Sequence, residues 1–279
     1  MRLRVVLAPL FGSDADRAGL EVAVQIADRF MGHLIGLYVR PDPSDIVPVI
    51  GEGISPAIID QLTHAAQAEV DRRASLAKQQ FEAACGGAGT AATTGTEWLD
   101  IGGSRAPVVA RFGRVADLVV LTGDDADDGE RRRVIEAALL DTGRPLLLVP
   151  AGWTGDLGRT VAIAWNGRAE AARAVALAMP LLATAQKLCI LTAGTGRTAF
   201  EASADLATYL GRHGLACERH RVTFATEPVG EALLRHARGL DADLLVMGGY
   251  GRSRLAELVL GGVTRHLLTH LERPLLLAH

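Results

Sequence analysis

A glycine-rich segment between an apolar run and a predicted helix has the composition of a phosphate-binding turn. The segment MGGYGRSRLAELVLGGVTRHLL spans residues 247–268 and follows the apolar run ADLLV. Gly248 and Gly251 lack a Cβ, so the backbone could turn sharply there and approach a phosphate closely. A turn of this kind can also be only a tight connection between a strand and a helix, and both interpretations stay open.

The end of the same segment adds donors for an anion. Gly261 and Gly262 open the predicted helix VTRHLL, and a helix N-terminus presents free N–H groups and a positive dipole end. Thr264 contributes a hydroxyl within the first turn, while Arg252 and Arg265 could contribute positive charge. The pattern indicates an anion held mainly by backbone groups, as the phosphate tail of a nucleotide is.

The composition of the chain narrows the class of protein. The chain has 279 residues, enough for one large or two ordinary domains, and 49% of them are hydrophobic. A net charge of −3 gives no general attraction to nucleic acid or to anionic membranes. The sequence has no apolar run of about 18 residues and no signal-peptide pattern, so we expect a cytoplasmic protein without a membrane span. Its three cysteines are scattered, without metal-site or disulfide spacing.

An internal repeat divides the chain into two similar halves. The repeated strings, in the same order in both halves, are ADLVVLTG (116–123) with ADLLVMGG (242–249) and RPLLLVP (144–150) with RPLLLAH (273–279). A stretch rich in Gly and Pro separates the two copies at 150–160. We therefore expect two tandem domains, residues 1–150 and residues 151–279, called below the first half and the second half.

Each half has strands alternating with helices. In the second half, the apolar runs TVAIAW, KLCILTA and DLLVM alternate with segments of helical spacing, and CERHRVTF is a weaker, alternating run suited to a sheet edge. This alternation predicts an α/β fold with a mainly parallel, Rossmann-like sheet and helices on both faces. The first half carries roughly thirty extra residues after its second strand, which we expect to lead into a long helix over 57–83.

The string MGGYGRSRLAELVLGGVTRHLL, with RPLLLAH after it, resembles the C-terminal signature of the universal stress protein family. Nucleotide-binding members of that family carry G-x-x-G, nine residues, then G-[ST] between the fourth strand and the fourth helix. The resemblance covers nearly the whole chain as two domains in tandem, and the signature is present only in the second. It implies two open-sheet, adenine nucleotide alpha hydrolase-like domains, each with five strands in the order 3-2-1-4-5. It also implies that the last strands of the two domains, 145–149 and 274–278, pair with each other. Many members of the family bind ATP or AMP, and such proteins typically act in stress survival and signalling.

The resemblance assigns nucleotide binding to the second half. Gly248, Gly251 and Gly261 match the glycines of the motif. Two positions depart from it: Gly262 stands where the motif has Ser or Thr, and Asn166 stands where the first strand of ATP-binding relatives ends in Asp. The other positions implied are Ala164 and Trp165 at the first strand, Met247 at the fourth strand, and Arg252, Val263 and Thr264 in and after the motif.

The two departures weaken the expected site without abolishing it. One lost hydroxyl-to-phosphate hydrogen bond removes about 1.5–3 kcal/mol, roughly ten- to hundredfold in affinity. The backbone N–H of Gly262 is still present. Asn166 brings no charge to a divalent metal, so Mg²⁺-dependent triphosphate binding is less expected than binding of an adenine nucleotide as such. Trp165 could stack on adenine or fill the pocket, and the sequence does not choose between them.

The first half lacks the motif. Alignment of the two copies places Arg132 and Arg133 at the positions of the paired glycines, and Phe11 at the position of the first-strand Asp. Four aspartates within residues 124–128 would meet a phosphate with like charge. We expect no nucleotide binding of the family type in this half.

Other groupings carry weaker chemistry. His266 and His270 lie four residues apart on a predicted helix and could share a metal, but ordinary surface histidines are the simpler interpretation. Cys217 and His220 form a weaker pair still. The sequence has no convincing triad, redox motif or paired acid, so neither catalytic residues nor metal ligands are assigned.

Three functions fit these observations. The first is a stress-response protein that binds ATP, ADP or AMP in the second half and acts as a sensor or regulator, with the two halves paired as an intramolecular pseudo-dimer and a homodimer as a further option. The second is a scaffold or interaction protein with a vestigial or repurposed pocket, for which residues 41–60 are the recognition surface. The third, a slow ATPase, is disfavoured by Gly262 and Asn166.

Overall fold

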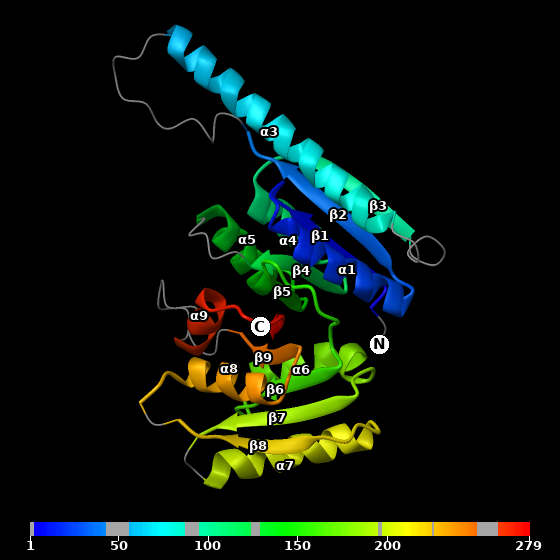
Figure 1. Cartoon of the computed structure of the whole chain (residues 1–279), viewed down its shortest axis with the longest axis vertical. Helices are drawn as coiled ribbons and strands as arrows, with labels where there is room; N and C mark the ends of the chain where they lie inside the picture. The colour runs from blue at the N-terminus through cyan, green and yellow to red at the C-terminus, as the bar shows by residue number, and fades with distance from the viewer. Residues whose placement is uncertain are drawn as a thin grey trace.

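In the computed structural model of the protein, the described residues form one sheet of ten strands (Figure 1). The strands follow the order β3-β2-β1-β4-β5-β10-β9-β6-β7-β8. They are β1 (Val5–Leu10), β2 (His33–Arg40), β3 (Gly95–Gly102), β4 (Leu118–Gly123), β5 (Leu146–Pro150), β6 (Thr160–Ala164), β7 (Lys187–Ala193), β8 (Glu218–Val222), β9 (Leu244–Gly248) and β10 (Leu275–Ala278). The structure describes residues 3–42, 56–86, 95–123, 129–194, 197–224, 226–249 and 262–279.

Each half of the chain repeats the strand order 3-2-1-4-5, which confirms the predicted fold. The strand pairs within a half are parallel. The uninterrupted apolar runs form the central strands, because a parallel strand with helices on both sides is buried on both faces. The alternating run CERHRVTF forms β8, which lies at the edge of the sheet as expected.

Helices cover both faces of the sheet. One face carries α1 (Asp16–Phe30), α3 (Pro56–Cys85), α6 (Ala169–Leu182) and α7 (Arg197–Arg212), and the other carries α4 (Arg105–Gly113), α5 (Gly129–Leu140), α8 (Val229–Gly239) and α9 (Gly262–Thr269). Each face has its own apolar core, and each core draws residues from both halves. Among the described residues, no helix combines the length and the apolar character needed to span a bilayer.

The two halves meet where β5 pairs with β10. This pairing is antiparallel, with Leu275 opposite Leu148 and Leu277 opposite Leu146, and all of these side chains are buried. Alternate leucines of the two strands point to opposite faces and enter both cores. The expected adjacency of the two last strands is therefore present, and it joins the halves into one sheet.

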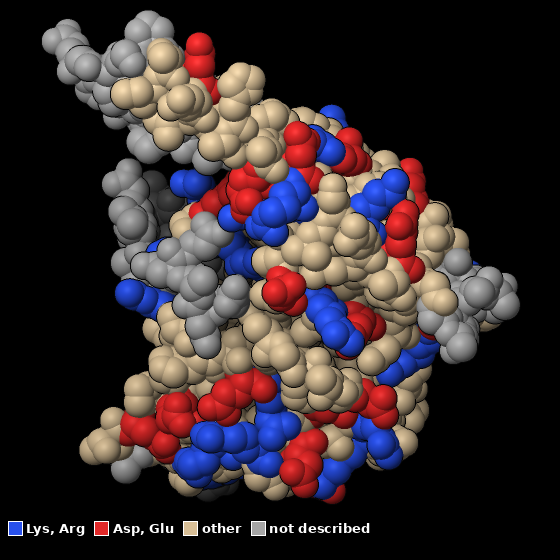
Figure 2. All heavy atoms as spheres, turned by 45° about the horizontal axis from the view of Figure 1, so that its top comes forward, with Lys and Arg blue, Asp and Glu red and all other residues tan. Residues whose placement is uncertain are grey.

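The long helix α3 extends past the body of the first half. It spans Pro56–Cys85, slightly longer than the predicted 57–83. Its C-terminal part packs on the sheet, where the Phe81 and Trp98 rings lie 5.4 Å apart between centroids. Its N-terminal part projects beyond the sheet (Figure 1) and exposes Ile58 and Leu62. Figure 2 shows that the surface of this end is mostly uncharged, while basic and acidic side chains are mixed over the rest of the visible surface.

An aspartate before the fourth strand of each half fastens the start of the first strand. Asp117 accepts hydrogen bonds from the backbone N–H groups of Arg4 and Val5, at 2.7 and 3.0 Å. In the second half, the Asp243 carboxylate accepts three, from residues 158–160, at 2.8, 2.9 and 3.1 Å. The repeated ADL string thus sets the register of β6 against β9, the two strands that end at the same edge of the sheet.

Replacing Asp243 with Ala should destabilise the protein by about 1.5–3 kcal/mol, because backbone donors lose a charged acceptor. Asp243→Asn should cost less, since one acceptor oxygen remains. Urea unfolding at neutral pH measures both values. The control is Asp156→Ala, which removes only an exposed ion pair to Arg159 and should change stability by less than about 1 kcal/mol. Equal losses in Asp243→Ala and Asp156→Ala would contradict the role given to Asp243.

Candidate functional site

A pocket of about 250 Å³ lies at the carboxyl ends of β6 and β9. The strand order of the second half reverses between these two strands, and open parallel sheets bind ligands at such a switch point. The pocket brings together seven of the residues predicted from the sequence, which are Ala164, Trp165, Asn166, Met247, Gly248, Val263 and Thr264.

The four remaining predicted residues lie after β9, up to the first residue of α9. Gly262 is the exposed first residue of α9, next to two residues that line the pocket. Gly251, Arg252 and Gly261 lie outside the described residues. The described part of the site is therefore the end of the sheet and the first turn of α9.

Trp165 forms a fixed wall at the edge of this pocket. Its side chain packs with the core on the α6 and α7 face, and its indole Nε1 donates to the backbone oxygen of Ala202 in α7 at 3.2 Å. Ala164, the residue before it, joins the core on the opposite face, because successive strand residues point to opposite sides. The indole is thus anchored to α7, and a pocket remains beside it.

Asn166 is part of the turn that starts α6. Its Oδ1 accepts a hydrogen bond from the Arg168 backbone N–H at 3.0 Å, and Gly167 between them has a φ of +72°. Side chains of Asn commonly close such turns. A metal ion bound to this oxygen would compete with the turn, which adds to the missing charge as a reason against a metal at Asn166.

Gly248 has a role in packing that the sequence did not indicate. A Cβ at this position would lie 2.5 Å from the backbone nitrogen of Ala171, inside α6. Glycine is therefore needed for the close approach of α6 to β9, with or without a ligand. At Gly262, by contrast, a Cβ would meet no described atom within 4 Å, so this position has room for a side chain.

Sequence reasoning missed four apolar residues of the pocket wall. Leu191 and Ala193 come from the end of β7, and Val229 and Leu233 come from α8. β7 is the neighbour of β6 in the sheet, so the end of KLCILTA could have been included once the order 3-2-1-4-5 was assumed. The contribution of α8 depends on how that helix lies across the sheet, which strand order alone does not define.

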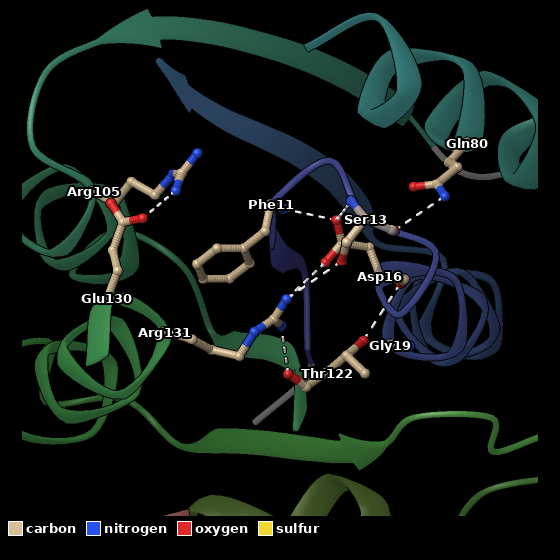
Figure 3. Close-up of polar contacts among 9 residues, drawn as sticks. All are labelled: Phe11, Ser13, Asp16, Gly19, Gln80, Arg105, Thr122, Glu130 and Arg131. Atoms are coloured by element: carbon tan, nitrogen blue, oxygen red, sulfur yellow. Dashed lines mark hydrogen bonds and ion pairs between the residues drawn. The ribbon is translucent and has the colours of Figure 1, made fainter. Parts of the chain in front are cut away.

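The corresponding position of the first half is filled by side chains of the protein itself (Figure 3). Phe11, directly after β1, is buried, and its ring lies between two guanidinium groups. The Cζ atom of Arg131 is 4.0 Å from the ring centroid, and that of Arg105 is 5.3 Å from it. Arg131 also donates to the backbone oxygen of Thr122 at the end of β4, at 2.9 Å. Stacked cationic and aromatic groups therefore occupy the space at the ends of β1 and β4, and a pocket of about 740 Å³ lies beside them, with Arg105 in its wall.

Asp16 is a buried anion at this position. Its side chain is only 2% exposed, and Oδ2 accepts hydrogen bonds from the Phe11 and Ser13 backbone N–H groups at 2.8 and 3.1 Å. Arg131 Nη2 lies 3.7 Å from the other carboxylate oxygen. Burial raises the pKa of Asp16 above its usual value, although the N–H donors and the Arg131 charge act in the opposite direction. The loop after β1 thus already holds a carboxylate of the protein itself.

His266 on α9 and His270, directly after that helix, are engaged within the protein. The His266 and His270 rings stack with centroids 4.3 Å apart, and His266 Nε2 lies 3.2 Å from a Glu231 carboxylate oxygen. This arrangement fits the simpler interpretation, in which His266 is a partly buried histidine and His270 is a surface histidine.

Comparisons with known proteins agree on the fold. Residues 197–279 match the model of the universal stress protein family. A universal stress protein from Archaeoglobus fulgidus is 16% identical over 98% of this chain and 97% of its own, with a TM-score of 0.68. A putative universal stress protein from Pseudomonas aeruginosa is 14% identical over 99% and 93%, with a TM-score of 0.58. At sequence identities this low, the similarity to these structures shows a shared fold and nothing about function.

No curated protein matches the chain. The family match covers the part of the second half that contains α7, β8, α8, β9, α9 and β10, and the structural likeness extends over both halves. Residues 197–279 therefore belong to the universal stress protein family, and the chain as a whole has the fold of universal stress proteins.

Proposed function

We propose that the second half binds an adenine nucleotide in the pocket at the ends of β6 and β9. The observation that carries this proposal is the position of the pocket, at the switch point of the sheet and against the first turn of α9. Seven of the residues that meet there were predicted from the sequence, and they come from three separate parts of the chain, 164–166, 247–248 and 263–264. A tight strand-to-helix connection alone would not require such a pocket.

The two ends of the pocket differ in chemistry. Leu233, Met247 and Val263 give it an apolar wall, which suits the faces of a purine. The first turn of α9, with Gly262 and Thr264, offers N–H groups, a hydroxyl and the positive end of the helix dipole. The volume of about 250 Å³ lies slightly below the usual range of ligand pockets, which begins at about 300 Å³. We infer that the base and ribose occupy the pocket and the phosphates lie on α9.

The first half acts as a structural partner in this proposal. Phe11, Arg131 and Asp16 occupy the space at the ends of β1 and β4, which corresponds to the pocket of the second half, and this favours one nucleotide per chain. The domain boundary is proposed between Pro150, where β5 ends, and Thr160, where β6 begins. The two domains would form an intramolecular pseudo-dimer through β5 and β10.

The biological role that follows is that of a stress-response sensor or regulator, in which nucleotide occupancy alters a surface of the protein. The second candidate is an interaction protein, favoured by the apolar side chains that the projecting end of α3 exposes, Ile58, Ile59 and Leu62. Hydrolysis is the least favoured activity, because Asn166 is engaged in the turn before α6.

Calorimetric titration with ATP, ADP and AMP should show one micromolar site per chain, with little dependence on Mg²⁺. Val263→Glu should weaken binding by about a hundredfold or more, because a carboxylate would face the phosphates at short range. The fold should persist, since acidic residues are favourable in the first turn of a helix. Val263→Gln is the matched control, with the same shape and no charge. Absence of heat and of a thermal shift at millimolar nucleotide would remove this proposal and leave the interaction protein.

Gly262→Ser should tighten nucleotide binding. The position has room for a side chain, and the added hydroxyl would donate to a charged phosphate, a bond worth about 1.5–3 kcal/mol. The expected gain is therefore roughly ten- to hundredfold in Kd, measured by the same titration. Gly262→Ala separates the hydroxyl from any effect on the helix backbone. An equal change in the Ser and Ala variants would show that the hydroxyl does not reach a phosphate.

Arg131→Met should destabilise the protein by about 3–5 kcal/mol, because it leaves Asp16 buried without its cation. The loss should grow with pH. Without Arg131, the already raised pKa of Asp16 rises further, so the folded variant resists ionisation while the unfolded chain ionises near pH 3.9. At lower pH, where Asp16 is protonated in both proteins, the difference should shrink.

Urea unfolding between about pH 4 and pH 7 measures this dependence on the Asp16 charge. Adding Asp16→Asn to Arg131→Met should recover part of the stability and remove the pH dependence of the loss. A loss that stays constant over this range would refute the coupling of the two residues. Neither variant should change the stoichiometry of nucleotide binding.

A further inference from the structure

A cysteine, a glutamate and a histidine gather at the outer edge of the second half, away from the filled site of the first. The Cys189 thiol, the Glu218 carboxylate and the His220 imidazole each offer one atom, and these three atoms lie within 4.8 Å of one another. His220 Nε2 is 3.1 Å from a Glu218 oxygen, and Cys189 Sγ is 4.0 Å from the same oxygen.

Strand register produces this cluster. β7 and β8 are parallel neighbours, with Cys189 opposite Glu218 and Leu191 opposite His220. Residues two apart on a strand point to the same face, so Glu218 and His220 both project to the side of Cys189. The weaker pair considered from the sequence, Cys217 with His220, is separated by this alternation, because Cys217 packs with the core on the opposite face.

We propose that Cys189, Glu218 and His220 form a binding site for a divalent transition-metal ion, with Zn²⁺ as the best match. Sulfur, imidazole nitrogen and carboxylate oxygen are the ligands of zinc, at about 2.0–2.3 Å. In a tetrahedral site these bond lengths place the ligand atoms about 3.3–3.6 Å apart. The separations of 3.1 and 4.0 Å bracket that range, so small side-chain rotations complete the geometry.

The surroundings of the cluster fit an ion that is reached from solvent. Cys189 is buried, while Glu218 and His220 lie on β8, the edge strand, with side chains 56% and 30% exposed. Three protein ligands leave the fourth position of zinc to water or to an exogenous group. The site is independent of the nucleotide pocket, since none of its three residues lines that pocket.

Lys187 is the cation that a metal would displace. Its Nζ lies 3.2 Å from the Glu218 oxygen that also meets His220. The lysine side chain is 42% exposed, so it can turn into solvent at small cost. A divalent ion would take over the neutralisation of Glu218 and would add bonds to sulfur and nitrogen that an ammonium group cannot make.

The test is a zinc titration of the full chain, free of any affinity tag and stripped of metal, against a chromophoric chelator. We expect one Zn²⁺ per chain. Cys189→Ala and His220→Gln should each weaken binding at least about a hundredfold, since even residues that only support a metal ligand are worth 10–100-fold. Lys187→Met should tighten it by up to about fivefold, because an exposed ion pair no longer competes.

Cobalt substitution identifies the ligands directly. Bound Co²⁺ should show a thiolate-to-metal charge-transfer band that disappears in Cys189→Ala and persists in Cys217→Ala, the matched control one residue from Glu218 on the other face. Circular dichroism of each apo variant checks that the fold is kept. The proposal is overturned if the wild type retains no zinc at micromolar concentration, if Cys189→Ala and His220→Gln bind as the wild type does, or if the band follows Cys217.

Discussion

The antiparallel pairing of β5 with β10 is the contact on which the rest of the structure depends. It converts two five-stranded sheets into one and gives each face a core shared by both halves. Reciprocal glycine–leucine contacts support it. A Cβ on Gly123 would lie 2.4 Å from the Leu271 side chain, and a Cβ on Gly249 would lie 3.0 Å from that of Leu139. The glycine of the first half is the last residue of β4, and that of the second half directly follows β9. Each packs against a leucine of the other half, and these contacts fix the position of β9, which forms part of the pocket.

Sharing one sheet lets the two copies differ at their ligand ends. Stability of the junction comes from the buried leucines, which both copies keep in the RPLLL string, so the loops at the carboxyl ends of the strands are free to diverge. In the first half, backbone N–H groups of the loop after β1 bind the Asp16 carboxylate. Phe11 and Arg131 stack in the space that corresponds to the pocket. In the second half the same sheet end keeps a pocket. Side chains that fill a site stabilise the folded protein whether or not a ligand is present. An open site stabilises the folded protein only when a ligand is bound.

Strand order and much of the candidate site were predictable because both follow from where apolar runs end. Residues at the ends of the first and fourth strands must converge in the order 3-2-1-4-5, which is why Ala164 and Met247, both predicted from the sequence, line the same pocket. What escaped prediction depends on distances between elements. The indole of Trp165 is directed by Ala202 on α7, thirty-seven positions away, and Cys189 meets His220 only through the register of β7 with β8. The spacing of residues along a single segment predicts neither of these two contacts.

The glycines of the motif serve two purposes that the sequence pattern does not separate. In the first half, Gly19 of α1 approaches Thr122 of β4, and a Cβ on this glycine would lie 2.4 Å from the Thr122 hydroxyl. In the second half the glycine is on the strand instead, where Gly248 meets Ala171 of α6. The same close approach of helix to strand is thus achieved with the small residue on either partner. Gly248 is therefore needed for packing in the second half whether or not a ligand binds, so the motif glycines that bear on ligand binding are those beyond it, together with the first turn of α9.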